Sequence, residues 1–183
     1  MKVKECILAA ANQLGIGDEI EEYLDGTSTL GEADAACLLR CFNLVENELA
    51  LDYLPLFCED TLESGTGAVF FSELSQAAVR IVKVTDEWGN ELPFTLFPEY
   101  IKTQAGKIVV RYTYTPKEKQ FEEDSSFALY ASVRLFAYGI AAEYATANGS
   151  FEEAAVWDKK YKDAIAAAYR SRKAKKIKSR RWA

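Results

Sequence analysis

The last third of the chain, residues 124–183, constrains the fold most, because two long helical patterns are separated there by one short turn. The first pattern runs from Asp124 or Ser125 to about Ala147, and the second follows Ser150. Apolar residues recur in both at spacings of three and four, which is typical of helices with one buried face. A turn as short as Asn148-Gly149 predicts an antiparallel helical hairpin over residues 124–169. The apolar face of its first arm is expected at Leu129, Val133, Phe136, Ile140 and Tyr144.

A basic tail follows the hairpin at residues 170–183. Eight of its fourteen residues are Lys or Arg and none is acidic, whereas the other 169 residues carry 14 basic and 28 acidic side chains. Arg and Trp are enriched among the residues that dominate binding at protein interfaces. We therefore expect the tail to dock on a partner protein, with nucleic-acid binding and a purely solubilising role as alternatives. The candidate docking residues are Arg170, Arg172, Lys173, Lys175, Lys176, Lys178, Arg180, Arg181 and Trp182.

The first 58 residues predict a group of helices. Apolar spacing favours a helix over Lys2–Leu14 and a short one over Glu19–Leu24. Thr29 and Glu32 have the spacing of a capping box, which predicts a third helix from there to about Tyr53. We expect these helices to pack with the C-terminal hairpin as one helical domain.

A β-rich insertion is predicted at residues 68–115, after a polar linker at Glu59–Gly67. Its strand candidates are Ala68–Phe71, Val79–Thr85, Leu92–Phe97 and Lys107–Thr115. The last has the alternation of a strand with one buried face, and the short connections predict a small antiparallel meander. The expected fold class is therefore α+β and mainly α, with an N-terminal helical bundle, a β insertion and a C-terminal hairpin.

The absence of histidine excludes several enzyme mechanisms, although it leaves carboxylate and lysine chemistry possible. Without it there is no Ser–His–Asp or Cys–His catalysis and no imidazole metal ligand. The acidic clusters at residues 18–25 and 118–124 are interpreted as solvated surfaces, with a magnesium site as the alternative. Neither Gly15-Ile16-Gly17 nor Gly65-Thr66-Gly67 has the context of a phosphate-binding loop. We expect no enzyme activity and no cofactor.

The four cysteines are Cys6, Cys37, Cys41 and Cys58, and they lack the close pairs that are typical of zinc knuckles. We interpret them as buried free thiols in a reducing cytoplasm, with a zinc site as the alternative. An early Glu5 argues against a signal peptide, and no apolar run reaches the ~18 residues of a membrane span.

Five stretches of the chain, together with the order of helices, β insertion and helical hairpin, have a familiar pattern. They are Leu14–Glu19, Phe42–Leu49, Ala141–Tyr144, Asn148–Glu153 and Lys178–Trp182. In these features the chain resembles the small head–tail connector proteins, also called adaptor or neck proteins, of tailed bacteriophages. The resemblance extends over most of the chain.

The resemblance implies a structural virion protein made in the host cytoplasm. It implies a homo-oligomeric ring, typically a dodecamer, that binds the portal protein and receives the stopper or tail-completion protein, with DNA passing through its lumen. A nucleic-acid-binding regulator that uses the basic tail is the alternative function. A carboxylate-metal enzyme is a third option, and it requires acidic residues from distant segments to converge.

Overall fold

The computed structural model describes residues 1–172, with side chains described through Tyr169, and these residues form two compact units. The helical unit comprises Met1–Glu46 and the chain from Glu118 to the end of the last helix. The β unit comprises Asn47–Lys117. The fold is thus α+β with antiparallel sheets, as the sequence predicted.

Five α-helices account for most of the described residues outside the β unit. They are α1 (Val3–Leu14), α2 (Gly17–Leu24), α3 (Glu32–Glu48), α4 (Val133–Ala147) and α5 (Phe151–Arg172). A π-helical turn at Leu49–Tyr53 continues α3. Gly15 ends α1 in the left-handed conformation, with φ of 78°, which a glycine adopts without strain.

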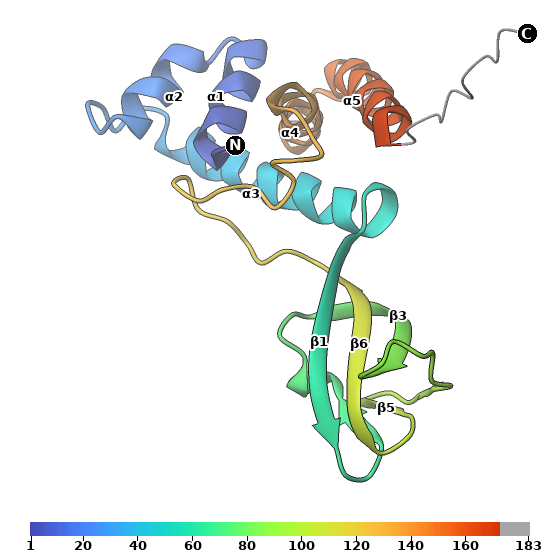
Figure 1. The fold of residues 1–183 in the computed structure, drawn as a ribbon. Coiled ribbons are helices and arrows are strands. Elements are labelled where there is room, and N and C mark those ends of the chain that lie inside the picture. The colour runs from blue at the N-terminus through green and yellow to red at the C-terminus, as the bar shows by residue number, and fades with distance from the viewer. Residues whose placement is uncertain (173–183) are drawn as a thin grey trace, which may run out of the picture. The chain divides into compact units, whose positions relative to one another are not determined.

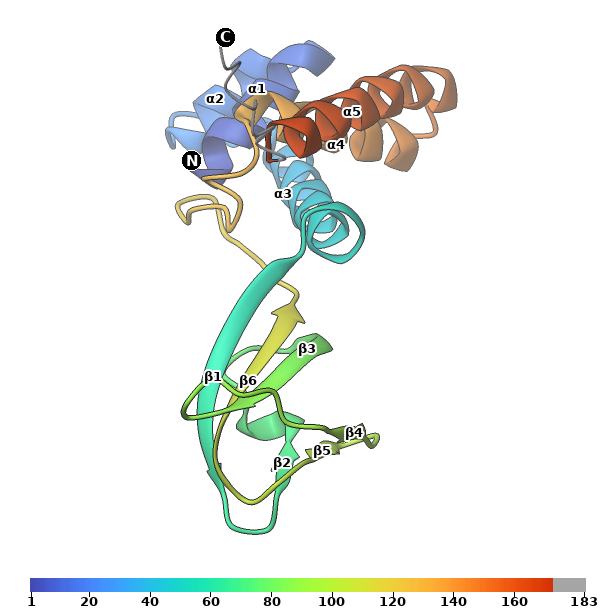
Figure 2. The ribbon, with the colours of Figure 1, turned by 45° about the vertical axis from the view of Figure 1, so that its right-hand side comes forward.

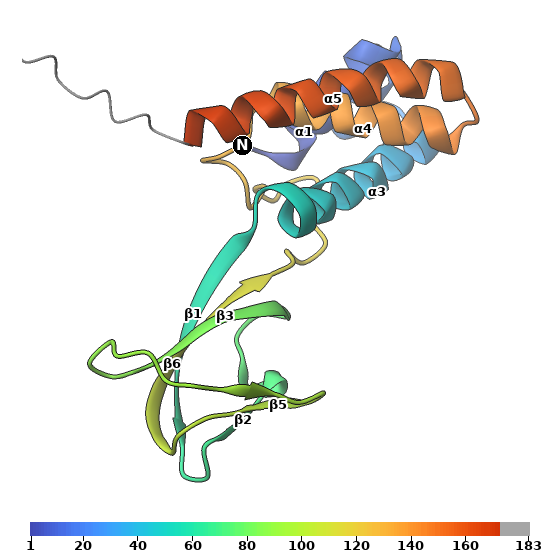
Figure 3. The same cartoon turned by 90° about the vertical axis from the view of Figure 1, so that its right-hand side faces the viewer.

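The helices of the helical unit lie side by side in the order α2, α1, α4, α5, and α3 crosses beneath them (Figure 1). Helices α4 and α5 form the predicted antiparallel pair, which Figure 3 shows along its length. The rings of Phe42 on α3 and Phe136 on α4 stack with centroids 5.0 Å apart. Further along, Gly139 lies so close to Val45 and Tyr161 that α3, α4 and α5 converge on one point of the core.

The first arm of the hairpin begins later than the sequence predicted, at Val133 rather than near Asp124. Ser132 caps it, because its Oγ accepts a hydrogen bond from the backbone N–H of Leu135 at 3.2 Å. Residues 124–132 are not helical, and the predicted core residue Leu129 is 88% exposed. The reason is a competing set of contacts: the segment bonds to Glu46 and buries Phe127 instead of extending the helix.

The β unit holds two antiparallel sheets of three strands each. The first has the order β1 (Leu56–Ser64), β6 (Gly106–Tyr114), β3 (Ala78–Asp86), and the second has the order β2 (Ala68–Phe70), β5 (Tyr100–Lys102), β4 (Thr95–Leu96). The strands are labelled in Figure 2. The core of the unit is apolar: Val69, Ile81, Val84, Ile101, Ile108, Val110 and Tyr112.

Three sequence predictions for the β unit are wrong. The expected linker Glu59–Gly67 is largely strand β1, which pairs with β6 from Leu56↔Tyr114 to Ser64↔Gly106. The first sheet is not a meander, because β6, the last strand in the sequence, lies between β1 and β3. The predicted strand Leu92–Phe97 shrinks to Thr95–Leu96, consistent with prolines at 93 and 98 that cannot donate ladder hydrogen bonds.

Within residues 1–172, no helix combines the length and the apolar character that crossing a membrane requires.

Candidate docking surfaces and polar clusters

The basic tail is only partly within the structure. Arg170 and Arg172 belong to the last turn of α5, so the backbone remains helical beyond the predicted hairpin end at residue 169. The other candidate docking residues, Lys173, Lys175, Lys176, Lys178, Arg180, Arg181 and Trp182, lie outside the described residues. Their role as docking residues stays a prediction.

The helical unit carries a groove of about 530 Å³ along the α4–α5 pair, which we call the hairpin groove. Its walls combine aromatic and small side chains with three charges. The lining residues are Tyr130, Ser132, Arg134, Leu135, Tyr138, Lys160, Asp163, Ala164, Ala167 and Ala168. Small residues on α5 open the groove, because alanines leave room where larger side chains would fill it.

The position of Lys160 in the hairpin groove is set by two aromatic rings. Its Nζ lies 3.9 Å from the ring centroid of Trp157 and 5.8 Å from that of Tyr138. A cation over an aromatic face is attracted by the ring quadrupole, which holds the ammonium at the groove wall. The two rings also stack at 5.9 Å, and Trp157 Nε1 donates a hydrogen bond to Glu153 Oε1. Trp157, which is 8% exposed, is thus a packing residue.

Sequence reasoning missed the hairpin groove. The alanines of α5 carry no sequence signal that separates a buried position from an exposed one, and helical spacing at Tyr138 is equally typical of a core residue. No sequence pattern therefore indicates the groove.

A second surface is the acidic edge, which we define as α2, the loop to α3 and Glu32 at the start of α3. All its acidic side chains are exposed: Asp18, Glu19, Glu21, Glu22, Asp25 and Glu32. Among them Leu30 is 68% exposed. The carbonyl oxygen of Glu22 accepts hydrogen bonds from Thr27 Oγ1 at 2.9 Å and from its N–H at 3.0 Å, so the loop folds back onto α2.

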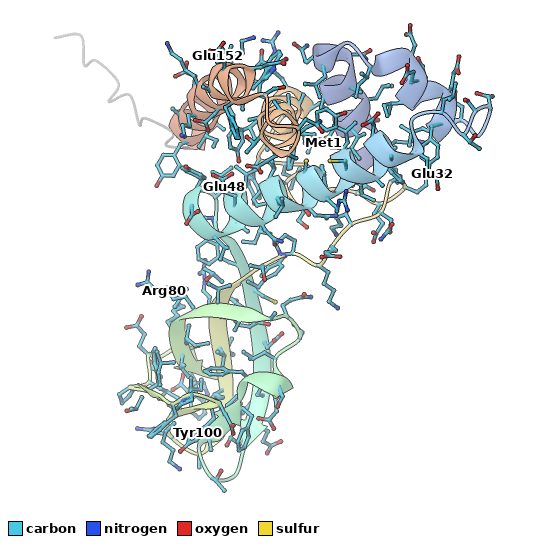
Figure 4. All side chains as sticks on the ribbon, turned by 180° about the vertical axis from the view of Figure 1, so that it is seen from behind. Met1, Glu32, Glu48, Arg80, Tyr100 and Glu152 are labelled. Atoms are coloured by element: carbon cyan, nitrogen blue, oxygen red, sulfur yellow. The ribbon has the colours of Figure 1, made fainter. Side chains whose placement is uncertain are left out.

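The β unit carries an exposed aromatic cluster on its second sheet. Phe97 and Tyr100 stack with ring centroids 4.7 Å apart, and Phe70 lies 5.5 Å from Tyr100. Arg80 and Tyr100 are marked in Figure 4. Phe97 also lines a hollow of about 250 Å³, together with Arg80. Exposed apolar clusters of this kind are typical of interaction surfaces.

Trp88 is the most exposed tryptophan among the described residues, at 79%, in the turn after β3. Asp86 shapes this turn, since its carboxylate accepts hydrogen bonds from the N–H groups of Trp88 and Asn90 and from the Asn90 side chain. The Asn90 side-chain hydrogen bond is the main cause that lowers the pKa of Asp86. The indole is thus held out on a well-ordered turn.

A polar network joins the strands of the first sheet around Asp60. Tyr112 Oη donates to Asp60 Oδ2 at 2.6 Å, and the Oγ and N–H of Ser75 donate to the same carboxylate at 2.8 and 2.7 Å. Desolvation acts to raise the pKa of Asp60, but these hydrogen bonds outweigh it and lower the pKa. Burial and the Asp60 bond raise the pKa of Tyr112 to about 12.

The Asp60 network is suited to holding strands together rather than to catalysis. A carboxylate with a lowered pKa is a weak general base, and a tyrosine with a raised pKa stays protonated near neutrality. Asp60, the carboxylate that accepts the hydrogen bond of Ser75 Oγ, is therefore a weak base for the proton of that hydroxyl. Sequence analysis missed the network because it placed Asp60 in a linker.

Glu46 on α3 is a buried carboxyl in the helical unit, with 1% of its surface exposed. Its Oε1 accepts hydrogen bonds from Ser125 Oγ at 2.8 Å and the Ser126 N–H at 2.7 Å. Its Oε2 finds no hydrogen-bond donor among the described residues. Burial raises the pKa of Glu46, although the two hydrogen bonds act to lower it. The residue thus holds the segment before α4 in place, and burying its charged form costs free energy.

The four cysteines are free thiols within the described structure. Burial is the main cause that raises the pKa of both Cys6 and Cys41 to about 12, and the neighbouring Cys37 contributes at Cys41. Thiols with such values are poor nucleophiles and poor metal ligands near neutral pH. Over residues 1–172, no group of three or more Cys, Asp or Glu side chains is arranged to hold a metal ion.

A comparison of the chain with protein-family models finds no match, and no curated protein matches it either.

Proposed function

We propose that the chain is a structural head–tail connector of a tailed bacteriophage, a subunit of a ring that joins the portal to the stopper or tail. The observation that carries the proposal is the hairpin groove. It is a partly apolar hollow on a helical hairpin, which suits a subunit that binds other chains. The sequence resemblance then selects phage connectors among assembly proteins.

The charge distribution supports a ring through which DNA passes. Residues 1–172 carry 28 acidic and 16 basic side chains, a net charge of −12. An acidic wall repels the phosphate backbone, so DNA slides past without binding to it. The basic residues at 173–181 are then available for a partner rather than for the lumen.

The two units give the subunit two separate kinds of surface. The helical unit offers the hairpin groove, and the β unit offers the aromatic cluster of Phe70, Phe97 and Tyr100. A connector has at least two partners besides its own copies, the portal and the stopper or tail-completion protein. We assign the basic C-terminal segment of the chain to the contact with the portal. The aromatic cluster is then the candidate surface for the stopper or tail-completion protein.

The mass of the purified protein, alone and with the portal protein, tests the proposal. We expect a stoichiometric complex of many copies on the portal ring, measured by mass photometry and by negative-stain microscopy. A ring formed without the portal supports the same conclusion. A chain that stays monomeric at micromolar concentration with the portal present would contradict it. High affinity for DNA that falls steeply with salt would favour the nucleic-acid-binding alternative instead.

A further inference from the structure

We infer that the hairpin groove of one copy receives the acidic edge of a second copy, in a head-to-tail contact. This inference rests on the proposed function in that both require copies of the chain to associate. The inference adds the identity of the two surfaces that meet. Neither the fold class nor the sequence resemblance specifies them.

The first step is the charge of the two surfaces. From Cys6 to Leu39 the chain has seven acidic residues and no basic one, and this stretch contains the whole acidic edge. On the groove side, Arg134 and Lys160 line the walls against the single carboxylate Asp163, and Lys159 is exposed nearby on α5. The two surfaces are therefore electrostatically complementary, which favours and orients their association.

The second step is shape. The acidic edge presents Leu30 as an exposed apolar side chain, and its loop is anchored to α2 through Glu22. Gly31 follows with φ of 82°, and a β-carbon there would lie 3.0 Å from the carbonyl oxygen of Glu19. The backbone around Leu30 is thus fixed close to the acidic residues. The groove provides apolar wall atoms from Leu135, Ala164 and Ala167 to receive such a side chain.

The third step is the position of the two surfaces in the helical unit. Helix α2 lies at one side of the row of helices and α5 at the other, separated by α1 and α4 (Figure 1 and Figure 4). They cannot meet within one copy, so a contact between them requires a second copy. A contact between two different surfaces is heterologous, and its repetition closes into a ring or continues as a filament.

Charge reversal tests the inference. One variant reverses the acidic edge, with Glu19→Lys and Glu22→Lys, and the other reverses the groove, with Arg134→Glu and Lys160→Glu. All four side chains are exposed. Each variant alone should associate with itself at least about tenfold more weakly than the unmodified chain, because like charges then face each other. An equimolar mixture should recover assembly, because every contact in an alternating ring is again between opposite charges.

Matched controls separate these effects from changes of folding and of net charge. Reversal of the exposed Glu87 and Glu91 in the β unit changes the net charge by the same amount as the acidic-edge variant and should leave assembly unchanged. Leu30→Ala should weaken assembly, whereas Leu44→Ala, an exposed leucine on α3, should not. Assembly is measured by sedimentation over a concentration series. If the chain assembles only in the presence of the portal protein, the same measurement is made with the portal present.

The outcomes distinguish this inference from the proposed function. If a ring forms and is insensitive to both reversals, or the mixture does not recover assembly, the contact lies elsewhere and only the inference is overturned. If the unmodified chain forms no multi-copy complex even with the portal, both are overturned. If deletion of residues 173–183 strengthens assembly and removes its sensitivity to the acidic-edge reversal, the chain's own tail occupies the groove, which also overturns the inference.

Discussion

Glu46 illustrates how one buried residue decides where a helix begins. Its carboxylate accepts hydrogen bonds from Ser125 and Ser126, in the segment that the sequence assigned to the start of a helix. The segment has helical periodicity, but helix formation there competes with hydrogen bonds to the buried Glu46 carboxylate, which needs donors. The donors come from the chain just before α4, and the helix starts only when Ser132 supplies a cap.

The raised pKa of Glu46 predicts how stability depends on pH. The folded state holds the Glu46 proton more tightly than the unfolded state, so the contribution is full below the unfolded pKa near 4.5 and is lost as the pH rises through the folded pKa. Glu46→Gln keeps an oxygen acceptor and cannot ionise. We expect the free energy of unfolding of this variant to fall less than that of the unmodified chain as the pH rises from about 4.5 to neutrality.

Chemical denaturation over a pH series measures this difference. Glu21→Gln is the matched control, because it removes one carboxylate from an exposed position on α2 and should leave the pH dependence unchanged. Identical pH profiles for Glu46→Gln and the unmodified chain would show that the buried carboxyl ionises as freely in the folded state as in the unfolded state.

The helices and the longest alternating strand of the chain were predictable because their signals are local. Periodicity places α4 and α5 as an antiparallel pair, and alternation places β6. The pairing of β1 with β6 depends on residues about fifty positions apart, such as Leu56 and Tyr114, and no local pattern specifies it. The Asp60 network depends on this long-range pairing, because it joins Asp60 on β1 to Tyr112 on β6. The hairpin groove depends on which positions of α4 and α5 stay uncovered, and no local pattern indicates that either.

The approach of three helices at Gly139 yields a prediction for the helical unit. A β-carbon at this position would lie 2.9 Å from Tyr161 Cε2 and 2.9 Å from Val45 Cγ1, closer than real contacts allow. Gly139→Val therefore overpacks the meeting point of α3, α4 and α5. We expect it to lower the free energy of unfolding by about 1–3 kcal/mol, the usual range for added volume in a packed core.

Urea denaturation followed by circular dichroism at a helical wavelength measures the effect of Gly139→Val. Ala155→Val is the control, since it places the same side chain at an exposed position of α5 and should cost about 0.5 kcal/mol or less. Equal stability of the two variants would mean that the three helices can separate at Gly139 without loss of packing.

At the scale of the whole molecule, the chain combines an acidic folded body with a basic end. All 28 acidic residues precede residue 164, and six basic residues follow residue 172. Opposite charges placed this way attract the tail to acidic surfaces over about a Debye length, roughly 10 Å at 0.1 M salt. We propose that closer contact with a partner depends on Arg180, Arg181 and Trp182, because Arg and Trp are enriched among interface anchors.

Deletion of residues 173–183 should separate folding from docking. The described core buries its apolar residues within the helical and β units, so circular dichroism and the unfolding midpoint should stay unchanged. Portal binding, measured by surface plasmon resonance, should weaken by about 100-fold or more, since both charge and anchor are lost.

A second variant keeps every residue of the given chain but changes its six terminal basic residues to Gln. It retains Trp182, so it measures the contribution of the charge alone. We expect it to bind with intermediate affinity and with little dependence on salt, whereas the unmodified chain weakens as salt rises. Portal binding that survives the deletion would place the portal contact on the folded units instead.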